Sequence, residues 1–391
     1  MTLQIGKPKA QLVPLSEASG RILAEDLIAL DSLPRFDKSA MDGYAINSTD
    51  STGASQSKPA VFQLTDKQEL GAKQAKQVWT GNPIPKGADA VIMLENTMKS
   101  DGKLEVWSQL RPCENVSKVG EDIKKDTVIA IAGTRLNPYH IGLAAAQGFS
   151  KLNVTMKPKI GIIATGNELV EPGTKLSGSL IYDSNKVMIS AACTELGAET
   201  TDFGIVEDNV DKIAERIHEI LKTQEAVVTT GGTSVGGLDL VPDAVNKLGK
   251  PGVVVHGVAL RPAMPTALAI LDRKPVLILS GNPVAAIIGF EVFGRPLVCK
   301  MLGMYTTELR PFLRAILNRR VASALGRKTY VRVRVTMEDD EFWAEPVSAK
   351  GSGSISTMTQ SNGFVVVPEN REGIDEGESV LVYMFGKLEA H

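Results

Sequence analysis

The run Ala226-Val-Val-Thr-Thr-Gly-Gly-Thr-Ser-Val-Gly-Gly-Leu-Asp239 joins a short apolar segment to a glycine-rich turn. Residues 226–230 predict a buried strand, and the residues after Asp239 predict a helix. Glycines let main-chain N–H groups approach an anion, and the start of a helix adds partial positive charge. The turn therefore has two interpretations, a phosphate cradle or a tight turn without a ligand.

The same alternation of strand and helix extends over residues 159–303. The predicted strands are nearly continuous in apolar residues and cover 159–164, 200–206, 226–230, 252–260, 266–271 and 276–279. Predicted helices cover 184–196, 210–222 and 283–302. This pattern is typical of a mostly parallel α/β sheet that is covered on both faces. In such sheets ligands bind beyond the carboxyl ends of the strands, where the glycine-rich turns of this chain fall.

Regions rich in short β-prone runs flank this α/β core, at residues 32–120 and after residue 306. A helix predicted at 15–28, with a strand at 126–135 and a helix at 139–148, indicates a unit that the first β region interrupts. We therefore predict four domains. They are an N-terminal, dimer-forming domain of residues 1–30 plus 122–156, an inserted β-rich domain (31–121), an α/β domain (157–304) and a barrel-like C-terminal β domain (308–391).

Composition excludes several classes of protein. The 391 residues carry 43 Lys and Arg against 45 Asp and Glu, a net charge of −2, which argues against a nucleic-acid-binding protein. The three cysteines and four histidines are scattered, which argues against zinc ribbons and histidine-ligated metals. No apolar run approaches about 18 residues, and the start lacks a secretory signal, so we expect a cytoplasmic protein without a membrane segment.

Acidic residues stand at several predicted turns: Asp42, Asp122, Glu168, Asp208 and Asp239. Carboxylates on separate loops can hold Mg²⁺ against phosphate oxygens, although each one could instead cap a helix or a turn. The segment Gly232-Thr-Ser-Val-Gly236 also matches the nucleophile elbow of serine hydrolases. A triad would need His256 or the terminal His391, so the hydrolase is the less favoured alternative.

Seven motifs, taken in order, resemble those of the molybdopterin molybdenumtransferase family, which is known as MoeA and as the gephyrin E-domain. They are Ser39-Ala-Met-Asp-Gly-Tyr-Ala45, Thr80-Gly-Asn-Pro-Ile-Pro85, Gly120-Glu-Asp-Ile123, Ala164-Thr-Gly-Asn-Glu-Leu169, Tyr182-Asp-Ser-Asn185, Thr230-Gly-Gly-Thr-Ser-Val-Gly236 with Asp239, and Gly281-Asn-Pro-Val284. Each motif is short, but seven in the family's order are highly specific.

The resemblance implies an elongated homodimer, in which the α/β domain of one subunit faces the inserted β domain of the other. It also implies the last step of molybdenum cofactor synthesis. Molybdate enters the dithiolene of adenylylated molybdopterin, and AMP leaves with the help of Mg²⁺. A molybdopterin adenylyltransferase upstream and apo-molybdoenzymes downstream are the partners that this step implies.

The site residues that the resemblance implies fall into three groups. The catalytic group has Asp239, Glu168 and Asp208 in the α/β domain, with Asp42, Thr80 and Asp122 facing it from the other subunit; Asp239 and Glu168 are the first choices for Mg²⁺. The pterin and phosphate pocket has Gly231, Gly232, Ser234, Gly236, Asn185, Gly281, Asn282 and Pro283. Arg261 binds the oxyanion, and Ser352 and Ser354 lie on a C-terminal Gly/Ser loop that closes the pocket.

The chain departs from the family at one place. Where the family usually has Lys-Pro-Gly-Lys-Pro, this chain has Arg261-Pro-Ala-Met-Pro265, so Met264 replaces a cation. The loss of a cation weakens the attraction for a dianion, whereas the guanidinium group of Arg261 can still bind an oxyanion through two hydrogen bonds. We therefore hypothesise an altered affinity or choice between molybdate and tungstate. The alternatives are a tungstate-preferring paralogue, a carrier that binds adenylylated molybdopterin without turnover and, less favoured, a molybdopterin adenylyltransferase.

Overall fold

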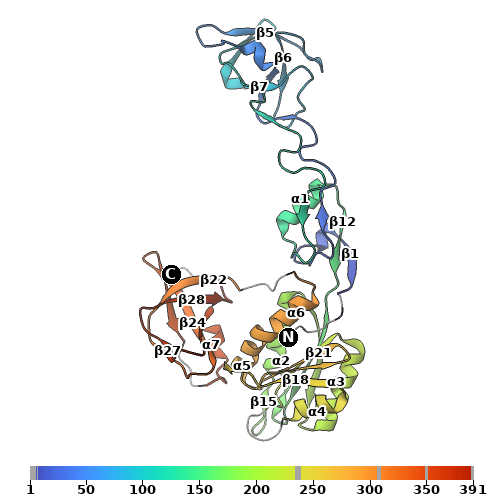
Figure 1. Ribbon diagram of the computed structural model, residues 1–391, viewed down its shortest axis with the longest axis vertical. Helices are drawn as coiled ribbons and strands as arrows, with labels where there is room; N and C mark the ends of the chain where they lie inside the picture. The colour runs from blue at the N-terminus through green and yellow to red at the C-terminus, as the bar shows by residue number, and fades with distance from the viewer. Residues whose placement is uncertain (1–5, 7, 234–238, 306–309, 348–350, 389–391) are drawn as a thin grey trace.

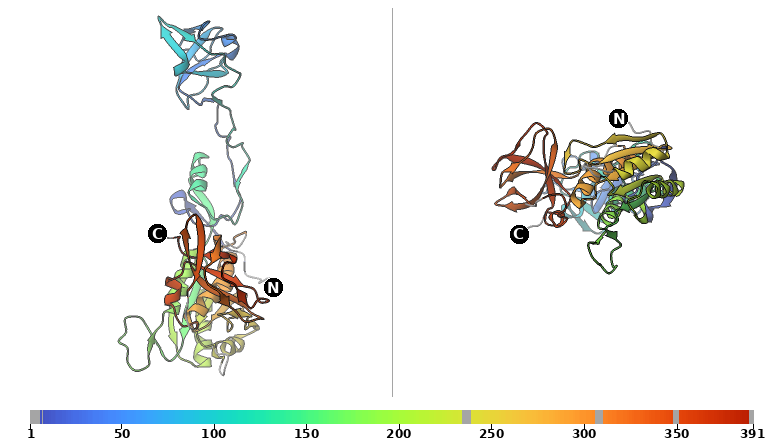
Figure 2. Two further views of the ribbon diagram at one scale, coloured as in Figure 1. Left: turned by 90° about the vertical axis from the view of Figure 1, so that its left-hand side faces the viewer. Right: turned by 90° about the horizontal axis from the view of Figure 1, so that it is seen from below.

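The computed structural model describes residues 6, 8–233, 239–305, 310–347 and 351–388. The molecule is elongated (Figure 1). The α/β unit and the C-terminal barrel lie side by side at one end, and a small β-sheet unit lies at the other end. A narrow stem that contains α1, β1 and β12 joins the two ends, and the left-hand view in Figure 2 agrees with this arrangement. No helix of the described residues has the length and apolar character needed to span a membrane.

The α/β unit is built on a six-stranded sheet of order β16-β13-β17-β21-β20-β18. The first four strands are parallel, and the last two run antiparallel to their neighbours. The strands are β13 (Lys159–Thr165), β16 (Glu199–Val206), β17 (Ala226–Thr230), β18 (Pro251–His256), β20 (Ala267–Leu271) and β21 (Lys274–Leu279). The helices are α2 (Asn185–Leu196), α3 (Val210–Thr223), α4 (Leu240–Leu248), α5 (Pro283–Gly289) and α6 (Arg295–Met301). Two apolar clusters cover the two faces of the sheet, so the predicted α/β class is confirmed.

Two predicted elements of this unit are interrupted. The helix predicted at 283–302 forms as α5, a π-helical segment η4 (Phe290–Gly294) and α6, because Pro296 lacks the N–H that an α-helix needs in its interior. The strand predicted at 252–260 is wrong beyond His256. Gly257 has φ +74° and turns the chain, so the next two residues of regular structure form β19 (Leu260–Arg261), which pairs with the C-terminal sheet instead.

The C-terminal unit is a closed barrel, as predicted. Five strands close on one another in the order β24-β25-β22-β28-β26, because β24 pairs with both β25 and β26. The elements are β22 (Phe312–Leu317), β23 (Val321–Ala322), β24 (Lys328–Glu338), β25 (Glu341–Pro346), α7 (Ser356–Thr359), β26 (Gly363–Val367), β27 (Gly373–Ile374) and β28 (Ser379–Met384). Val333, Val365 and Val382 fill its interior.

The unit at the far end is a six-stranded curled sheet of order β7-β4-β6-β5-β9-β8. Its elements and those of the connecting neck are β3 (Lys38–Ser39), β4 (Gly43–Ile46), η2 (Ser48–Ser51), β5 (Ala60–Leu64), β6 (Gln74–Val78), β7 (Ala90–Met93), η3 (Leu94–Asn96), β8 (Thr97–Ser100), β9 (Lys103–Val106) and β10 (Val116–Ser117). We call this unit the outer sheet. The β-rich texture predicted for this region is confirmed.

The stem is formed by two separate stretches of the chain. Its elements are β1 (Ala10–Pro14), η1 (Leu15–Glu17), β2 (Leu27–Ile28), β11 (Val128–Ala130), α1 (Pro138–Ala146) and β12 (Lys151–Thr155). The predicted helix at 15–28 is wrong, because Gly20 at φ +76° ends the single turn of η1. Ile22 and Leu23 are nevertheless buried, where they form β-bridges with residues 135 and 154. The domain boundaries stay a prediction.

Candidate active site

The floor of the site is formed where three parallel strands end side by side. The strands β13, β17 and β21 are neighbours in the sheet. Beyond them, the Gly231 N–H donates to the Leu279 carbonyl (3.1 Å), and the Asn185 amide donates to the Gly281 carbonyl (2.7 Å). A Cβ at Gly231 would lie 2.3 Å from the Thr165 carbonyl oxygen, so only glycine fits at its φ of +90°. Hydrogen bonds and close packing therefore fix the three strand ends relative to one another.

The floor also carries buried polar atoms that lack a hydrogen-bond partner among the described residues. They are Thr165 Oγ1, Asn185 Oδ1 and Thr233 Oγ1. Buried polar groups in proteins almost always have a partner, and each orphaned group costs about 1–3 kcal/mol. Three such atoms at one strand edge indicate a surface that a polar ligand or water completes. Ser234 and Gly236 of the predicted cradle lie outside the described residues.

The acidic residues of the α/β unit stand on the loops around this floor. Asp208 Oδ2 accepts from the Asn167 N–H (3.2 Å), and the Asp208 N–H donates to Asn167 Oδ1 (3.1 Å), so these two loops are joined. The Glu168 carboxylate lies over Gly166, with Oε2 2.8 Å from the position of an added Cβ. Asp239 precedes α4, and its Oδ2 lies 3.2 Å from Nε2 of His256.

These carboxylates do not form a complete metal site by themselves. No group of three or more His, Cys, Asp or Glu side chains within the described part of the chain is placed to hold a metal ion. Carboxylate oxygens are nevertheless the ligands that Mg²⁺ prefers, and Mg²⁺ in proteins usually keeps water and substrate phosphates as further ligands. Glu168 and Asp239 therefore fit Mg²⁺ only as partial ligands, together with a phosphate.

The other three predicted catalytic residues lie far from the floor of the same chain. Asp42 and Thr80 belong to the outer sheet at the opposite end of the molecule (Figure 1). The backbone N–H of Thr80 (2.8 Å) and its hydroxyl (2.7 Å) both donate to Asp42 Oδ1, and these bonds hold the Asp42 pKa below its ordinary value. Asp122 lies between β10 and β11, in the segment that connects the outer sheet to the stem, and its N–H donates to the Leu33 carbonyl (3.0 Å). One chain does not bring these residues to the floor.

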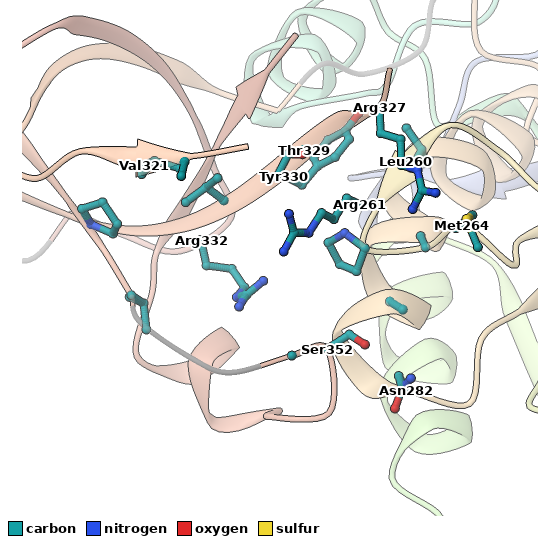
Figure 3. A pocket seen from close by; sticks show the side chains of 18 of the residues that line it. Leu260, Arg261, Met264, Asn282, Val321, Arg327, Thr329, Tyr330, Arg332 and Ser352 are labelled. Atoms are coloured by element: carbon teal, nitrogen blue, oxygen red, sulfur yellow. The ribbon is translucent and has the colours of Figure 1, made fainter. Parts of the chain in front are cut away.

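A cavity of about 600 Å³ lies between the α/β unit and the barrel. Five arginines line it and, among the described lining residues, no acidic residue does: Arg261, Arg319, Arg320, Arg327 and Arg332. Arg261 and Arg332 extend from facing walls (Figure 3). Nε of Arg332 is buried without a hydrogen-bond partner among the described residues, and burial lowers the pKa of this guanidinium. The cavity is therefore suited to an anion.

The cavity and the floor are contiguous. Ser280 and Asn282 line the cavity, and Gly281 between them accepts the hydrogen bond from Asn185 on the floor. Pro283 follows as the first residue of α5. From the barrel side, Ser352 lines the cavity, and its carbonyl accepts from the Val284 N–H (3.1 Å).

Arg261 and Met264 were predicted from the sequence, whereas the four arginines of the barrel were not. Met264 also lines the cavity, so the uncharged side chain lies in an arginine-rich wall. The pair Arg319-Arg320 was a signal that could have been noticed, because two adjacent cations stand in the β-prone region after residue 306. Ser354 lies two residues before the single turn α7, where its carbonyl accepts from the Thr357 hydroxyl (2.7 Å), and it does not line the cavity.

Comparison with known proteins agrees with this architecture. Three family descriptions match: the MoeA N-terminal region (domain I and II) at residues 1–148, the "Probable molybdopterin binding domain" at 161–300 and the MoeA C-terminal region (domain IV) at 314–385. A Methanocaldococcus jannaschii protein named for molybdopterin biosynthesis is 39% identical over 96% of this chain and 92% of its own length.

Two further relatives extend the comparison. The molybdopterin molybdenumtransferase of Bacillus subtilis is 34% identical over 96% of this chain and 90% of its own. A crystal structure of the molybdopterin biosynthesis MoeA protein from Pyrococcus horikoshii covers 98% of this chain and 96% of its own, with a TM-score of 0.81 and 32% identity. The chain therefore belongs to the MoeA family of molybdopterin molybdenumtransferases, which confirms the resemblance inferred from its motifs.

Proposed function

We propose that this chain transfers molybdenum from molybdate to adenylylated molybdopterin, with Mg²⁺-dependent release of AMP. Membership of the family makes it a transferase of molybdenum cofactor biosynthesis. The adenylylated form of the substrate and the requirement for Mg²⁺ are our proposal. One observation carries it: an arginine-lined cavity adjoins a floor of glycine turns through Ser280 and Asn282. An oxyanion and a phosphate-bearing ligand can therefore bind next to each other.

Each part of the site has a chemical role in this proposal. The turns at Gly231 and Gly281 let the phosphates approach the main chain. Asn185 Oδ1, which has no hydrogen-bond partner among the described residues, is an acceptor for the pterin or the ribose. Arg261 and Arg332 hold the molybdate dianion, since guanidinium groups pair with oxyanions in a bidentate manner. Glu168 and Asp239 would hold Mg²⁺, which when bound neutralises charge on the pyrophosphate that is cleaved.

The proposal includes a homodimer. Asp42, Thr80 and Asp122 lie too far from the floor of their own chain to act there, so in the proposed dimer they come from a second copy. The stem offers large apolar side chains that are exposed in the single chain, and they are Leu12 (68%), Ile28 (43%), Leu30 (53%) and Tyr139 (85%). We infer that the stem contributes to the dimer interface, since large exposed apolar surface often marks a protein–protein contact.

The replacement Asp239→Ala tests the catalytic proposal. We expect AMP release from adenylylated molybdopterin, measured with Mg²⁺ and saturating molybdate, to fall about one hundredfold, because a ligand of the charge-neutralising ion is lost. Asp243→Ala is the matched control, since Asp243 is an exposed carboxylate on the first turn of the same helix, α4. Equal rates in both variants would contradict the role of Asp239. Tight binding without AMP release in the wild type would favour the carrier.

The replacement Met264→Lys tests whether the missing cation affects the oxyanion. We expect the molybdate concentration that gives half-maximal AMP release to fall about tenfold, because a sixth cation joins the five arginines that line the cavity. Met264→Leu keeps the volume without the charge and should behave as the wild type. Tungstate is titrated in parallel. An unchanged dependence on both oxyanions in Met264→Lys would remove the hypothesis.

A further inference from the structure

A buried lysine, Lys186, follows the floor residue Asn185 in the sequence. Lys186 is the second residue of α2, and its side chain is 2% exposed. Its Nζ lies 2.6 Å from Glu171 Oε1, 2.8 Å from Asp202 Oδ1 and 3.9 Å from Asp183 Oδ2. Burial lowers the Lys186 pKa, but hydrogen bonds to Asp202 and Glu171 outweigh burial and raise it. The lysine is therefore a charged centre that needs its carboxylate partners.

The carboxylates around Lys186 come from different parts of the fold. Asp202 lies on β16 at the edge of the main sheet. Asp183 precedes α2, and its Oδ1 accepts from the Lys186 N–H (3.1 Å). Glu171 lies in an excursion that leaves the sheet after β13 and returns at α2, and we call residues 168–183 the 168–183 loop. Lys186 thus ties this loop to the sheet.

The 168–183 loop projects from the α/β unit (Figure 2) and is held mainly at its base. There, β14 (Leu169–Val170) pairs with β15 (Ile181–Tyr182). The Ile181 N–H donates to the Glu168 carbonyl (2.8 Å), and the Asp183 N–H donates to the Val170 carbonyl (3.0 Å). The backbone of Glu168 is therefore hydrogen-bonded to the base of the loop, so a shift of the base would move Glu168.

Lys186 connects the floor of the site with the 168–183 loop. It follows Asn185, whose amide donates to Gly281 on the floor. Through Glu171 it also reaches a point three residues from Glu168 in the loop. We propose that Lys186 is a positioning residue, which holds Glu168 against the floor through its ion pair with Glu171. The role of Glu168 in this statement rests on the proposed function, whereas the tie between Lys186 and the loop does not.

Two partners of Lys186 provide a matched pair of variants. Glu171 and Asp202 bind the same Nζ at similar distances, and their side chains are 50% and 59% exposed. Only Glu171 belongs to the loop. We expect Glu171→Gln to raise the Mg²⁺ concentration for half-maximal AMP release about tenfold with little change at saturation, as the loss of a supporting contact does for a metal ligand. We expect Asp202→Asn to leave it unchanged. Lys186→Met should raise this Mg²⁺ concentration as Glu171→Gln does. Lys186→Arg keeps the positive charge and should keep the wild-type value.

Trypsin gives a readout that needs no activity. Lys175 is the one basic residue in the 168–183 loop and is exposed. Cleavage after Lys175 is expected to be about tenfold faster in Glu171→Gln than in Asp202→Asn or the wild type. Equal cleavage rates in the three proteins would show that the Lys186–Glu171 ion pair does not hold the loop. Faster cleavage with an unchanged Mg²⁺ dependence would overturn positioning of Glu168. If the wild type released no AMP but Glu171→Gln were still cleaved faster than the wild type, the result would count against the proposed function alone.

Discussion

Glu291→Gln is expected to lower the free energy of unfolding by about 3–5 kcal/mol, the usual cost of removing one partner from a buried ion pair. Glu291 lies in η4, and its side chain is 8% exposed. Its carboxylate accepts from Arg295 Nε (2.9 Å) and from Arg310 Nη2 (2.6 Å). Arg310 is the first described residue of the C-terminal unit, so the cluster joins that unit to the α/β helices. The variant would leave two guanidinium groups facing a neutral amide.

Low pH should remove the difference in unfolding free energy between the wild type and Glu291→Gln. Burial raises the Glu291 pKa, but hydrogen bonds from Arg310 and Arg295 outweigh burial and hold it below its ordinary value of 4.5. The stabilisation is therefore complete above about pH 4.5 and is lost as the pH falls through the lower pKa of the folded state. Denaturant unfolding of the wild type and Glu291→Gln, followed from pH 7 downward, should converge.

Glu195→Gln is the control for Glu291. Glu195 Oε1 contacts the same Arg310 at 3.7 Å, but the Glu195 side chain is 64% exposed. Exposed pairs contribute about 0–1 kcal/mol, so this variant should unfold almost as the wild type does. A similar loss in both variants would mean that burial of the Glu291 cluster is not what matters.

Gly231→Ala is expected to cost about 3 kcal/mol of stability and to abolish measurable AMP release. Alanine at φ +90° costs about 1–2 kcal/mol, and an added Cβ would lie 2.3 Å from the Thr165 carbonyl oxygen. Thr165 is the last residue of β13, the strand next to β17 in the sheet, so relief of this contact costs about 1–3 kcal/mol more and moves the floor.

Gly148→Ala separates the two causes. Gly148 has φ +88°, close to that of Gly231, but nothing lies within 4 Å of the position of an added Cβ. It lies in the stem, away from the floor. We expect a loss of about 1 kcal/mol in thermal unfolding and normal AMP release. Equal losses of stability in the two variants would show that backbone conformation alone, and not contact with Thr165, limits residue 231.

The sequence predicted best those elements that local composition determines. The strand predicted at 226–230 matches β17 residue for residue, because it is a short β-prone run that ends at two glycines. The predicted helix at 15–28 failed because its apolar spacing suits a buried helix and an irregular buried segment equally well. Which of the two forms depends on contacts with residues 135 and 154, far along the chain.

The site was predictable where glycine and polar residues follow parallel strands, as at Gly231 and Gly281. The contribution of Arg332 to the cavity was not predictable. Arg332 and Arg334 alternate with valines in β24, a pattern that is also typical of an exposed strand face. Only the position of the barrel beside the α/β unit makes Arg332 face a cavity. Likewise, nothing local in Lys186 distinguishes a buried ion pair from a solvated helix cation.

The interrupted stem determines the order in which the molecule can fold during synthesis. Its pairing of Ala10 with Thr155 closes a very long loop, whereas all strands of the outer sheet lie within residues 43–106. Closure of long loops is entropically costly and slow, and chains emerge from the ribosome N-terminus first. All strands of the outer sheet are therefore synthesised before β12, so this sheet can form first. Until β12 is synthesised, β1 is an unpaired strand on the nascent chain, and chaperones or a neighbouring nascent copy can reach its free edge.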